Sequence, residues 1–200
     1  MEIPLFPLNT VLYPDGPLPL RIFEQRYLDM ISRCMKEEIP FGVALIKEGA
    51  EVGLAKVHDT GTLASITDWY QGSDGLLGIT AIGQQRFKIN SSQRQADGLM
   101  IADVNQLPSE LEVQLPDAYS PLADILTGVL DDLGRLYEQL EKRYADASWV
   151  SFRFAEILPI TPEQKQLLLE CDDPLQRLDE IRAVLESVRS VKYHSVLGSE

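Results

Sequence analysis

Apolar and polar positions alternate in short runs along the first half of the chain, up to about Pro108, and Gly, Asp, Asn and Ser separate the runs. This punctuation is typical of a β-rich fold. The turn QGSDGL between Tyr70 and Leu76 predicts a hairpin, because glycine readily adopts positive φ. Strands are expected at residues 3–8, 41–47, 62–71, 76–89 and 99–107.

Four glycines fall within or beside the predicted strands: Gly53, Gly61, Gly78 and Gly83. A missing side chain in a strand favours bulges and sharp bends. We therefore expect the sheet to coil into a small barrel.

One helix interrupts the strands. Phe23, Tyr27, Met30 and Ile31 recur at steps of three and four residues, which is the helical period. The helix is expected to end before Ile39-Pro40, because proline disfavours the helical conformation in the residue that precedes it.

After Pro116 the apolar period becomes helical. A long helix is expected from Ser120 as N-cap, with Pro121 at the first helical position. Its apolar face would contain Leu122, Ile125, Leu126, Val129, Leu133, Leu136 and Leu140.

Three further helices are expected. One covers residues 148–158, and the next begins at TPEQ, where Thr161 caps the helix and Gln164 can complete a capping box. The last helix repeats this logic with Asp173, Pro174 and Gln176. Four helical segments of this kind predict a compact bundle.

The change of period predicts an α+β protein in two subdomains. Residues 1–110 would form the β-barrel with its inserted helix, and residues 117–197 the C-terminal helical bundle. The expected boundary lies in residues 106–121, which contain three of the chain's prolines.

Composition narrows the possible partners. The 200 residues are 44% apolar, enough to bury a core, and carry a net charge of −13 without a basic cluster. Nucleic-acid binding and binding to anionic membranes are therefore not expected, because both depend on Lys and Arg near phosphates.

Two features of the sequence indicate the compartment. The start MEIPLFPL lacks the basic region and long apolar core of a signal peptide, and no run of about eighteen apolar residues exists. Cys34 and Cys171 are far apart and are expected to be buried free thiols. A cytoplasmic protein is predicted.

The sequence contains no motif that encodes a reaction. It has no glycine-rich phosphate loop ending in Lys-Ser or Lys-Thr and no G-x-S-x-G elbow. The two histidines, His58 and His194, are isolated from each other and from both cysteines. We predict no catalytic residue, no metal site and no cofactor; an enzyme would require Cys34 or His58 beside an acid in a cleft.

Four aromatic residues are candidates for peptide binding. Trp69 and Tyr70 end a predicted strand, and Trp149 and Phe152 begin a predicted helix. Aromatic rings at such junctions serve either as binding anchors or as packing between subdomains.

The stretch LPLRIFEQRYLDM places Arg21, Glu24 and Arg26 among apolar residues. The three side chains could satisfy one another as a structural network where the helix meets the barrel. Alternatively, the two arginines could bind a carboxylate-bearing partner in bidentate fashion.

Several runs of the chain resemble the N-terminal domain of the ATP-dependent Lon proteases, which is found also as free-standing bacterial proteins and within cereblon. The runs are PLFPLNTVLYPDGPLPLRIFEQRYLDM, FGVALIKEGAEVG, TGTLASI, DGLLGITAIGQQRFKI and FAEILPITPEQKQLLLECDDPLQRL. Gln25 departs from the pattern, since relatives often carry proline there. The resemblance implies a PUA-like β-barrel (pseudobarrel) joined to a helical bundle.

The resemblance also implies a function. In this family the domain engages substrate proteins, and the ATPase and Ser-Lys protease modules of Lon are separate from it. We expect a non-catalytic module that recognises unfolded or apolar polypeptide segments, or an adaptor for a protease or chaperone partner. The alternative is a PUA-like barrel that binds a small molecule or nucleic acid. The sequence leaves the oligomeric state open.

Overall fold

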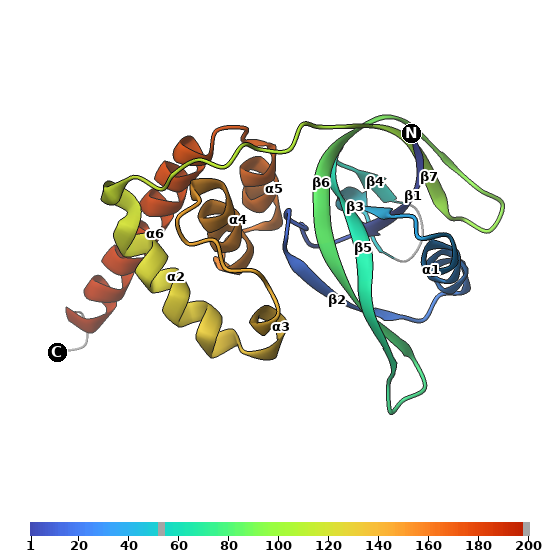
Figure 1. The fold of residues 1–200 in the computed structure, drawn as a ribbon, viewed down its shortest axis with the longest axis horizontal. Helices are drawn as coiled ribbons and strands as arrows, with labels where there is room; N and C mark the ends of the chain where they lie inside the picture. Colours follow the sequence, from blue (N-terminus) through green and yellow to red (C-terminus); the bar gives the residue numbers. More distant parts are fainter. Residues whose placement is uncertain (52–54, 198–200) are drawn as a thin grey trace.

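The computed structural model describes the backbone of residues 1–51 and 55–197 and the side chains of these residues up to 187. Strands occupy the N-terminal part of the chain and helices the C-terminal part. The two parts lie side by side, joined by the extended segment that follows the last strand (Figure 1). Gly53 and the side chain of His194 lie outside the described residues.

The strand part is an antiparallel sheet with one parallel pairing. Its order is β1-β7-β6-β5-β3-β4; in addition β2 pairs with β6, and β1 runs parallel to β3. The strands are β1 (Glu2–Leu8), β2 (Pro17–Ile22), β3 (Phe41–Gly49), β4 (Ala55–Val57), β5 (Thr60–Gln71), β6 (Leu77–Arg94) and β7 (Met100–Gln106).

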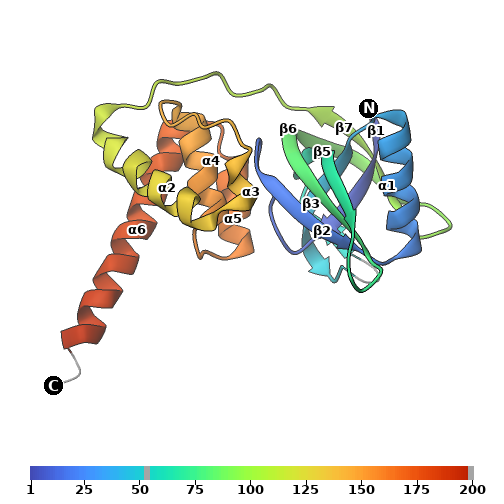
Figure 2. The same ribbon diagram turned by 60° about the horizontal axis from the view of Figure 1, so that its bottom comes forward.

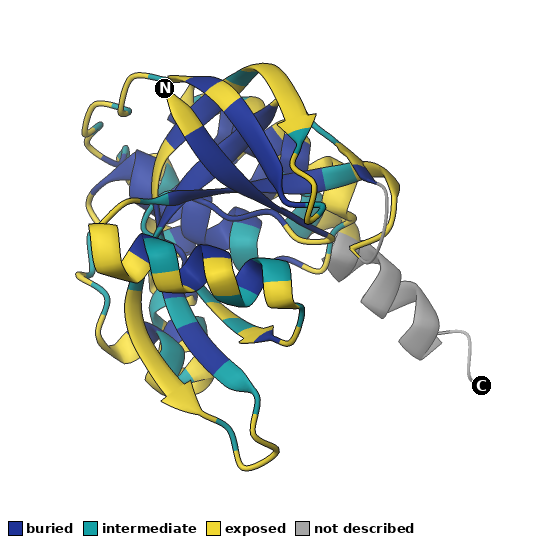
Figure 3. Ribbon diagram, turned by 90° about the vertical axis from the view of Figure 1, so that its right-hand side faces the viewer, coloured by how far each residue is buried: buried dark blue, intermediate teal, exposed yellow. Residues whose placement is uncertain are grey.

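The predicted hairpin at the QGSDGL turn is confirmed. It joins β5 to β6, and Gly75 in the turn has φ +81°, a conformation that favours glycine. The hairpin projects beyond the rest of the sheet as a mostly exposed arm (Figure 3).

Helix α1 (Gln25–Glu37) packs on the apolar interior of the sheet. It buries Tyr27, Met30, Ile31 and Cys34, and the Tyr27 ring stacks on Phe6 with 4.0 Å between centroids. The spacing of these apolar positions therefore predicted the helix correctly.

The predicted start of this helix at Phe23 was wrong. Strand β2 continues to Ile22, so Phe23 lies in the connection between β2 and α1 and is 62% exposed. No strand was predicted at β2, because Pro17 and Pro19 argue against one. Proline is tolerated here because, among the described strands, β2 pairs with β6 alone and so lies at an edge.

The helical part begins with a short 3₁₀ turn, η1 (Asp117–Tyr119), and α2 (Ser120–Leu133). The predicted cap at Ser120 was wrong: Ser120 is already the first residue of α2, and Tyr119 precedes it as N-cap without a side-chain hydrogen bond. The expected long helix also ends early, because Gly134 takes φ +62° and ψ −136°. After this glycine the chain forms the short α3 (Arg135–Glu138).

The remaining helices are α4 (Ala147–Ile157), α5 (Pro162–Glu170) and α6 (Pro174–Leu197). Helix α5 has the predicted capping box: Thr161 Oγ1 accepts from the Gln164 amide at 3.2 Å, and Gln164 Oε1 accepts from the Thr161 amide at 3.0 Å. At α6, Asp173 Oδ1 accepts from the amides of Leu175 and Gln176, so the predicted cap is confirmed.

Helix α4 lies at the centre of the helical part. It contacts α2, α5 and α6, and every residue from Ala147 to Ala155 is buried, as expected for a helix surrounded by others. Helix α6 extends away from these helices at its C-terminal end (Figure 2).

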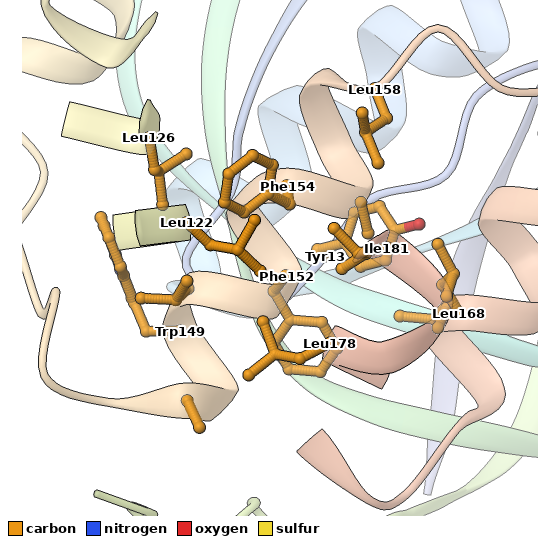
Figure 4. Packing of buried hydrophobic residues seen from close by; sticks show 14 of the residues in the cluster. Tyr13, Leu122, Leu126, Trp149, Phe152, Phe154, Leu158, Leu168, Leu178 and Ile181 are labelled. Carbon is orange, nitrogen blue, oxygen red and sulfur yellow. The ribbon is translucent and has the colours of Figure 1, made fainter. Parts of the chain in front are cut away.

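The core of the helical part includes residues from the strand part. Tyr13, from the loop between β1 and β2, is fully buried among Leu168, Ile181 and Phe152 (Figure 4). Its hydroxyl donates to the Lys165 carbonyl at 2.8 Å. One hydrophobic core therefore crosses from strands to helices.

Gly83 in β6 faces the same loop. Its amide donates to the Gly16 carbonyl at 2.9 Å, and its carbonyl accepts from the Asp15 amide at 2.8 Å. A Cβ at this position would overlap the Tyr13 carbonyl oxygen, so the loop can approach β6 only at glycine.

We predict that Gly83→Ala lowers the free energy of unfolding by about 2–3 kcal/mol, because the backbone of the loop must move. The control is Gly128→Ala in α2, where a Cβ meets nothing within 4 Å. This change should stabilise the protein by about 0.5–1 kcal/mol. Urea unfolding of both variants tests the prediction; equal stability of the two would contradict it.

Candidate functional site

A groove lies between the C-terminal end of α1 and the outer part of β5. Its volume is about 470 Å³. Its lining residues are Cys34, Met35, Glu38, Ile39, Ser65, Ile66, Thr67, Asp68 and Trp69.

Apolar side chains are exposed around this groove. Trp69 is 58% exposed, Met35 40% and Ile39 37%. Single exposed apolar residues are ordinary on a protein surface, but three around one groove favour contact with an apolar partner.

One edge of β5 is unpaired beside the groove. Strand β3 pairs with β5 only from Thr62 to Ala64, whereas β6 pairs with β5 up to Gln71. In the described part of the chain, residues 65–71 therefore have a strand on one side only. The Trp69 amide donates to Oδ1 of its neighbour Asp68 at 2.8 Å, a local substitute for pairing with a strand.

The free edge of β2 differs from that of β5. Strand β2 contains Pro17 and Pro19, which cannot donate a hydrogen bond to an added strand. Residues 65–71 of β5 contain no proline and no lysine, the two residues that most often protect an edge. Of these two edges, β5 is therefore the one able to receive another strand.

The four candidate aromatic residues are divided between two environments. Trp69 lines the groove, and Tyr70 is exposed on the same strand with its ring covering Gly78. Trp149 and Phe152 are buried in the helical core, where Trp149 makes an edge contact with Tyr144 and Phe152 packs near Tyr13.

The structure separates the three charged residues of the opening stretch. Arg21 is exposed and pairs with Asp74 in the hairpin turn. Arg26 is largely covered: it pairs with Glu24 at 2.8 Å, donates to the Gly98 carbonyl at 3.0 Å and lies over the Tyr27 ring. Glu24 and Arg26 therefore form a structural contact, and Arg21 does not belong to it.

A buried charge network that sequence reasoning missed lies between the two parts of the molecule. Glu110 accepts two hydrogen bonds from Arg177, at 3.0 and 2.6 Å, and lies 3.3 Å from Arg86. The Arg177 guanidinium stacks on Phe152, 3.7 Å from the ring centroid. Arg86 also donates to the Leu169 carbonyl at 2.7 Å. These residues are far apart in sequence, so no local pattern connects them.

A second buried charge contact joins α4 to the β1–β2 loop. Arg153 pairs with Glu156 at 3.1 Å and donates to the Pro14 carbonyl at 2.7 Å. Burial raises the pKa of Glu156, and Arg153 partly opposes this effect. Tyr137 donates to Glu156 at 2.7 Å. The contact links the helices to the loop that precedes β2.

A pocket of about 340 Å³ lies at the junction, beside the Glu110 network, and its lining contains both polar side chains and the candidate aromatic residues Trp149 and Phe152. Several of its polar residues contact one another: Arg143 pairs with Asp15, and Arg86 and Ser148 both contact Glu110. Contacts of this kind are typical of an interface between elements.

The residues considered for nucleophilic chemistry are not brought together. Burial raises the pKa of Cys34 to about 11, whereas His58 lies near Glu163 at the start of α5. None of the described contacts joins Cys34 to His58. The described residues also contain no group of three or more His, Cys, Asp or Glu side chains placed to hold a metal ion. Cys171 is only partly buried, so the expectation of two buried thiols was wrong.

The family model of the ATP-dependent protease La (LON) substrate-binding domain matches residues 2–187. The chain belongs to this family. The resemblance seen in the sequence is therefore confirmed.

Similar proteins agree with this membership. A Lon N-terminal domain protein from Xanthomonas campestris has a structure with a TM-score of 0.77 and 33% identity, over 92% of this chain and 98% of that one. The N-terminal domain of a Mycobacterium avium complex Lon protease shares the fold at a TM-score of 0.62, with 16% identity over 93% and 97%.

Curated relatives are longer. Lon protease 1 of Bdellovibrio bacteriovorus is 24% identical over 94% of this chain, and cereblon of Xenopus tropicalis is 28% identical over 55%. The chain spans about a quarter of the length of these relatives. Among the described helices, none has both the length and the apolar character needed to cross a membrane.

We predict that Glu110→Gln lowers the free energy of unfolding by about 3–5 kcal/mol, because the fully buried Arg177 loses its counter-charge. Arg86 keeps a second carboxylate partner, Asp172, at 2.9 Å. The matched control is Asp74→Asn, which removes the partner of the exposed Arg21 and should cost less than about 1 kcal/mol. Denaturant unfolding measures both. A smaller loss for Glu110→Gln than for Asp74→Asn would contradict the structural role of the network.

The two thiols should differ in reactivity. At pH 8 the Cys34 thiol, with its pKa of about 11, stays protonated and buried, whereas Cys171 is partly accessible. Iodoacetamide should therefore modify Cys171 first in the folded protein, as read by mass spectrometry of the intact chain and its peptides. Faster modification of Cys34 would show that the thiol is activated.

Proposed function

We propose that this protein is a non-catalytic recognition module that binds extended, apolar polypeptide segments at the groove between α1 and β5. The observation that supports it most is the unpaired edge of β5 directly beside that groove. Membership in a family of protease substrate-binding domains supports a polypeptide as the ligand.

Strand addition would supply the backbone part of the interaction. An extended segment beside residues 65–71 exchanges main-chain hydrogen bonds with β5 whatever its sequence. A module that recognises many unfolded clients needs such sequence-independent contacts. A carbonyl of the segment would replace the Asp68 side chain as the acceptor for the Trp69 amide, or would share that amide with it.

The groove would supply the side-chain part. Alternate side chains of the added strand face the same side, so one in two could enter between Met35, Ile39 and Trp69. The small area of these side chains predicts weak binding, with dissociation constants in the micromolar range or above. Weak binding suits a module that must release its clients to a protease or chaperone partner.

We also infer that the strands form the predicted PUA-like barrel and the helices a bundle. Pairing leads from β1 through β7, β6, β5 and β3 back to β1, which supports a closed arrangement. The proposed subdomains, residues 1–110 and 117–197, would then be two architectures that share the core around Tyr13.

A pair of modified peptides tests strand addition. In an extended peptide, the N–H groups of odd and even residues point to opposite edges. In an apolar nonapeptide, N-methylation of the odd residues therefore removes the N–H groups of one edge, and N-methylation of the even residues removes those of the other edge. Strand addition uses only one set, so one peptide should lose binding and the other keep it. Fluorescence anisotropy measures both. Equal affinities would argue against strand addition.

Trp69→Ala tests the location. Loss of an anchor ring should weaken binding of the unmodified peptide by about five- to thirtyfold. The control is Leu167→Ala in α5, an exposed apolar residue far from the groove, which should leave the affinity unchanged. Because Trp69 is exposed, both variants should unfold at the same urea concentration as the original protein. An unchanged affinity in Trp69→Ala would place the binding elsewhere.

A further inference from the structure

The end of the groove formed by α1 is electronegative. The Cys34 carbonyl accepts from the amides of Glu38 and Ile39, the latter at 3.1 Å. Helix geometry leaves the carbonyls that follow Cys34 in α1 without intrahelical donors. The C-terminal end of a helix also carries about half a negative charge from its macrodipole. A cation is therefore favoured beside this helix end.

Two carboxylates reinforce this potential from opposite walls. Glu38, in a left-handed conformation with φ 53°, lines the groove from the end of α1, and Asp68 lines it from β5. No Lys, Arg or His belongs to the described lining. Arg33 and Lys36 are the basic residues near this end of α1. Burial raises the pKa of the Cys34 thiol in the lining; the charge of Arg33 acts on this thiol and lowers its pKa, whereas Glu37 opposes the effect of Arg33.

The groove thus combines an apolar surface with a negative end. Met35, Ile39 and Trp69 favour an apolar side chain, whereas Glu38 and Asp68 favour a cation. Both types of contact lie within one groove and along one strand edge. Side chains at positions i and i+2 of an added strand face the same side and are spaced to reach both.

We propose that the groove selects extended polypeptide segments in which an apolar residue and a lysine or arginine occupy positions i and i+2. This inference rests on the proposed function and adds charge to its specificity. An acidic residue at the same position is disfavoured by Glu38, Asp68 and the helix end together. The selectivity comes from the groove and not from the net charge of the chain.

Three peptides with one sequence test the inference. They carry lysine, glutamine or glutamate two residues from a central leucine and are otherwise identical. In low salt the lysine peptide should bind about five- to tenfold more tightly than the glutamate peptide, with the glutamine peptide between them. In about 1 M salt, where the screening length is near 3 Å, the three affinities should converge.

A double variant assigns the selectivity to the groove. Glu38→Gln with Asp68→Asn keeps the size of both side chains and should reduce the preference for lysine to about twofold or less. The matched control, Asp131→Asn with Asp132→Asn in α2, removes the same total charge far from the groove and should keep the full preference.

The outcomes separate this inference from the proposed function. If the three peptides bind equally well, the charge preference is wrong and strand recognition stands. If the preference survives in the Glu38/Asp68 double variant or disappears in the α2 control, it arises from net charge and the inference is overturned. If none of the three peptides binds, the proposed function fails as well.

Discussion

The mismatch in length between β3 and β5 is the constraint on which the candidate site depends. Helix α1 runs to Glu37, Pro40 follows, and β3 cannot begin before Phe41. Strand β5 continues past the first residue of β3 because β6 still pairs with it. The unpaired edge of β5 and the groove at the end of α1 therefore have one origin, the place where the helix stops and the strand starts.

A second constraint keeps the strands and helices in one molecule. The β1–β2 loop inserts Tyr13 into the helical core, and Gly83 lets that loop approach β6. Around this apolar contact, Arg177 and Arg153 are fully buried, each beside a glutamate. Such charge pairs contribute less to stability than their number implies, because desolvation offsets most of the attraction. They do specify which surfaces meet, since any other docking would leave a buried charge without a partner.

The two binding contributions proposed for the groove differ in kind. Main-chain pairing along β5 does not depend on the sequence of the bound segment and allows many segments to bind. The apolar side chains and the two carboxylates of the groove, which come from both α1 and β5, would favour some of these segments over others. A recognition module benefits from this division, because it can accept many unfolded segments and still reject strongly acidic ones. In the polar network between strands and helices, by contrast, Glu110 is bound to Arg86 and Arg177.

Local sequence patterns were enough to predict those helices and turns whose residues contain a capping, turn or periodicity motif. The capping box at Thr161, the glycine turn between β5 and β6 and the buried positions of α1 were all predicted from neighbouring residues. The same patterns placed Phe23 in α1, whereas the pairing of β2 with β6 places it before the helix. They also made α2 too long, because the conformation of Gly134 ends that helix. The family could also be seen in the sequence, because its runs extend along nearly the whole chain.

Only the tertiary structure decided which residues share a site. Trp69 and Trp149 looked equivalent as aromatic residues at element ends, but Trp69 is exposed in the groove whereas Trp149 is buried in the core, beside the junction pocket. Met35, Glu38 and Asp68 carry no local signal, since their proximity arises from the packing of α1 beside an overlong hairpin. The spacing of apolar residues in the sequence determines whether a segment forms a helix or a strand. Which edge of a strand stays exposed depends on where its neighbouring strand, distant in sequence, ends.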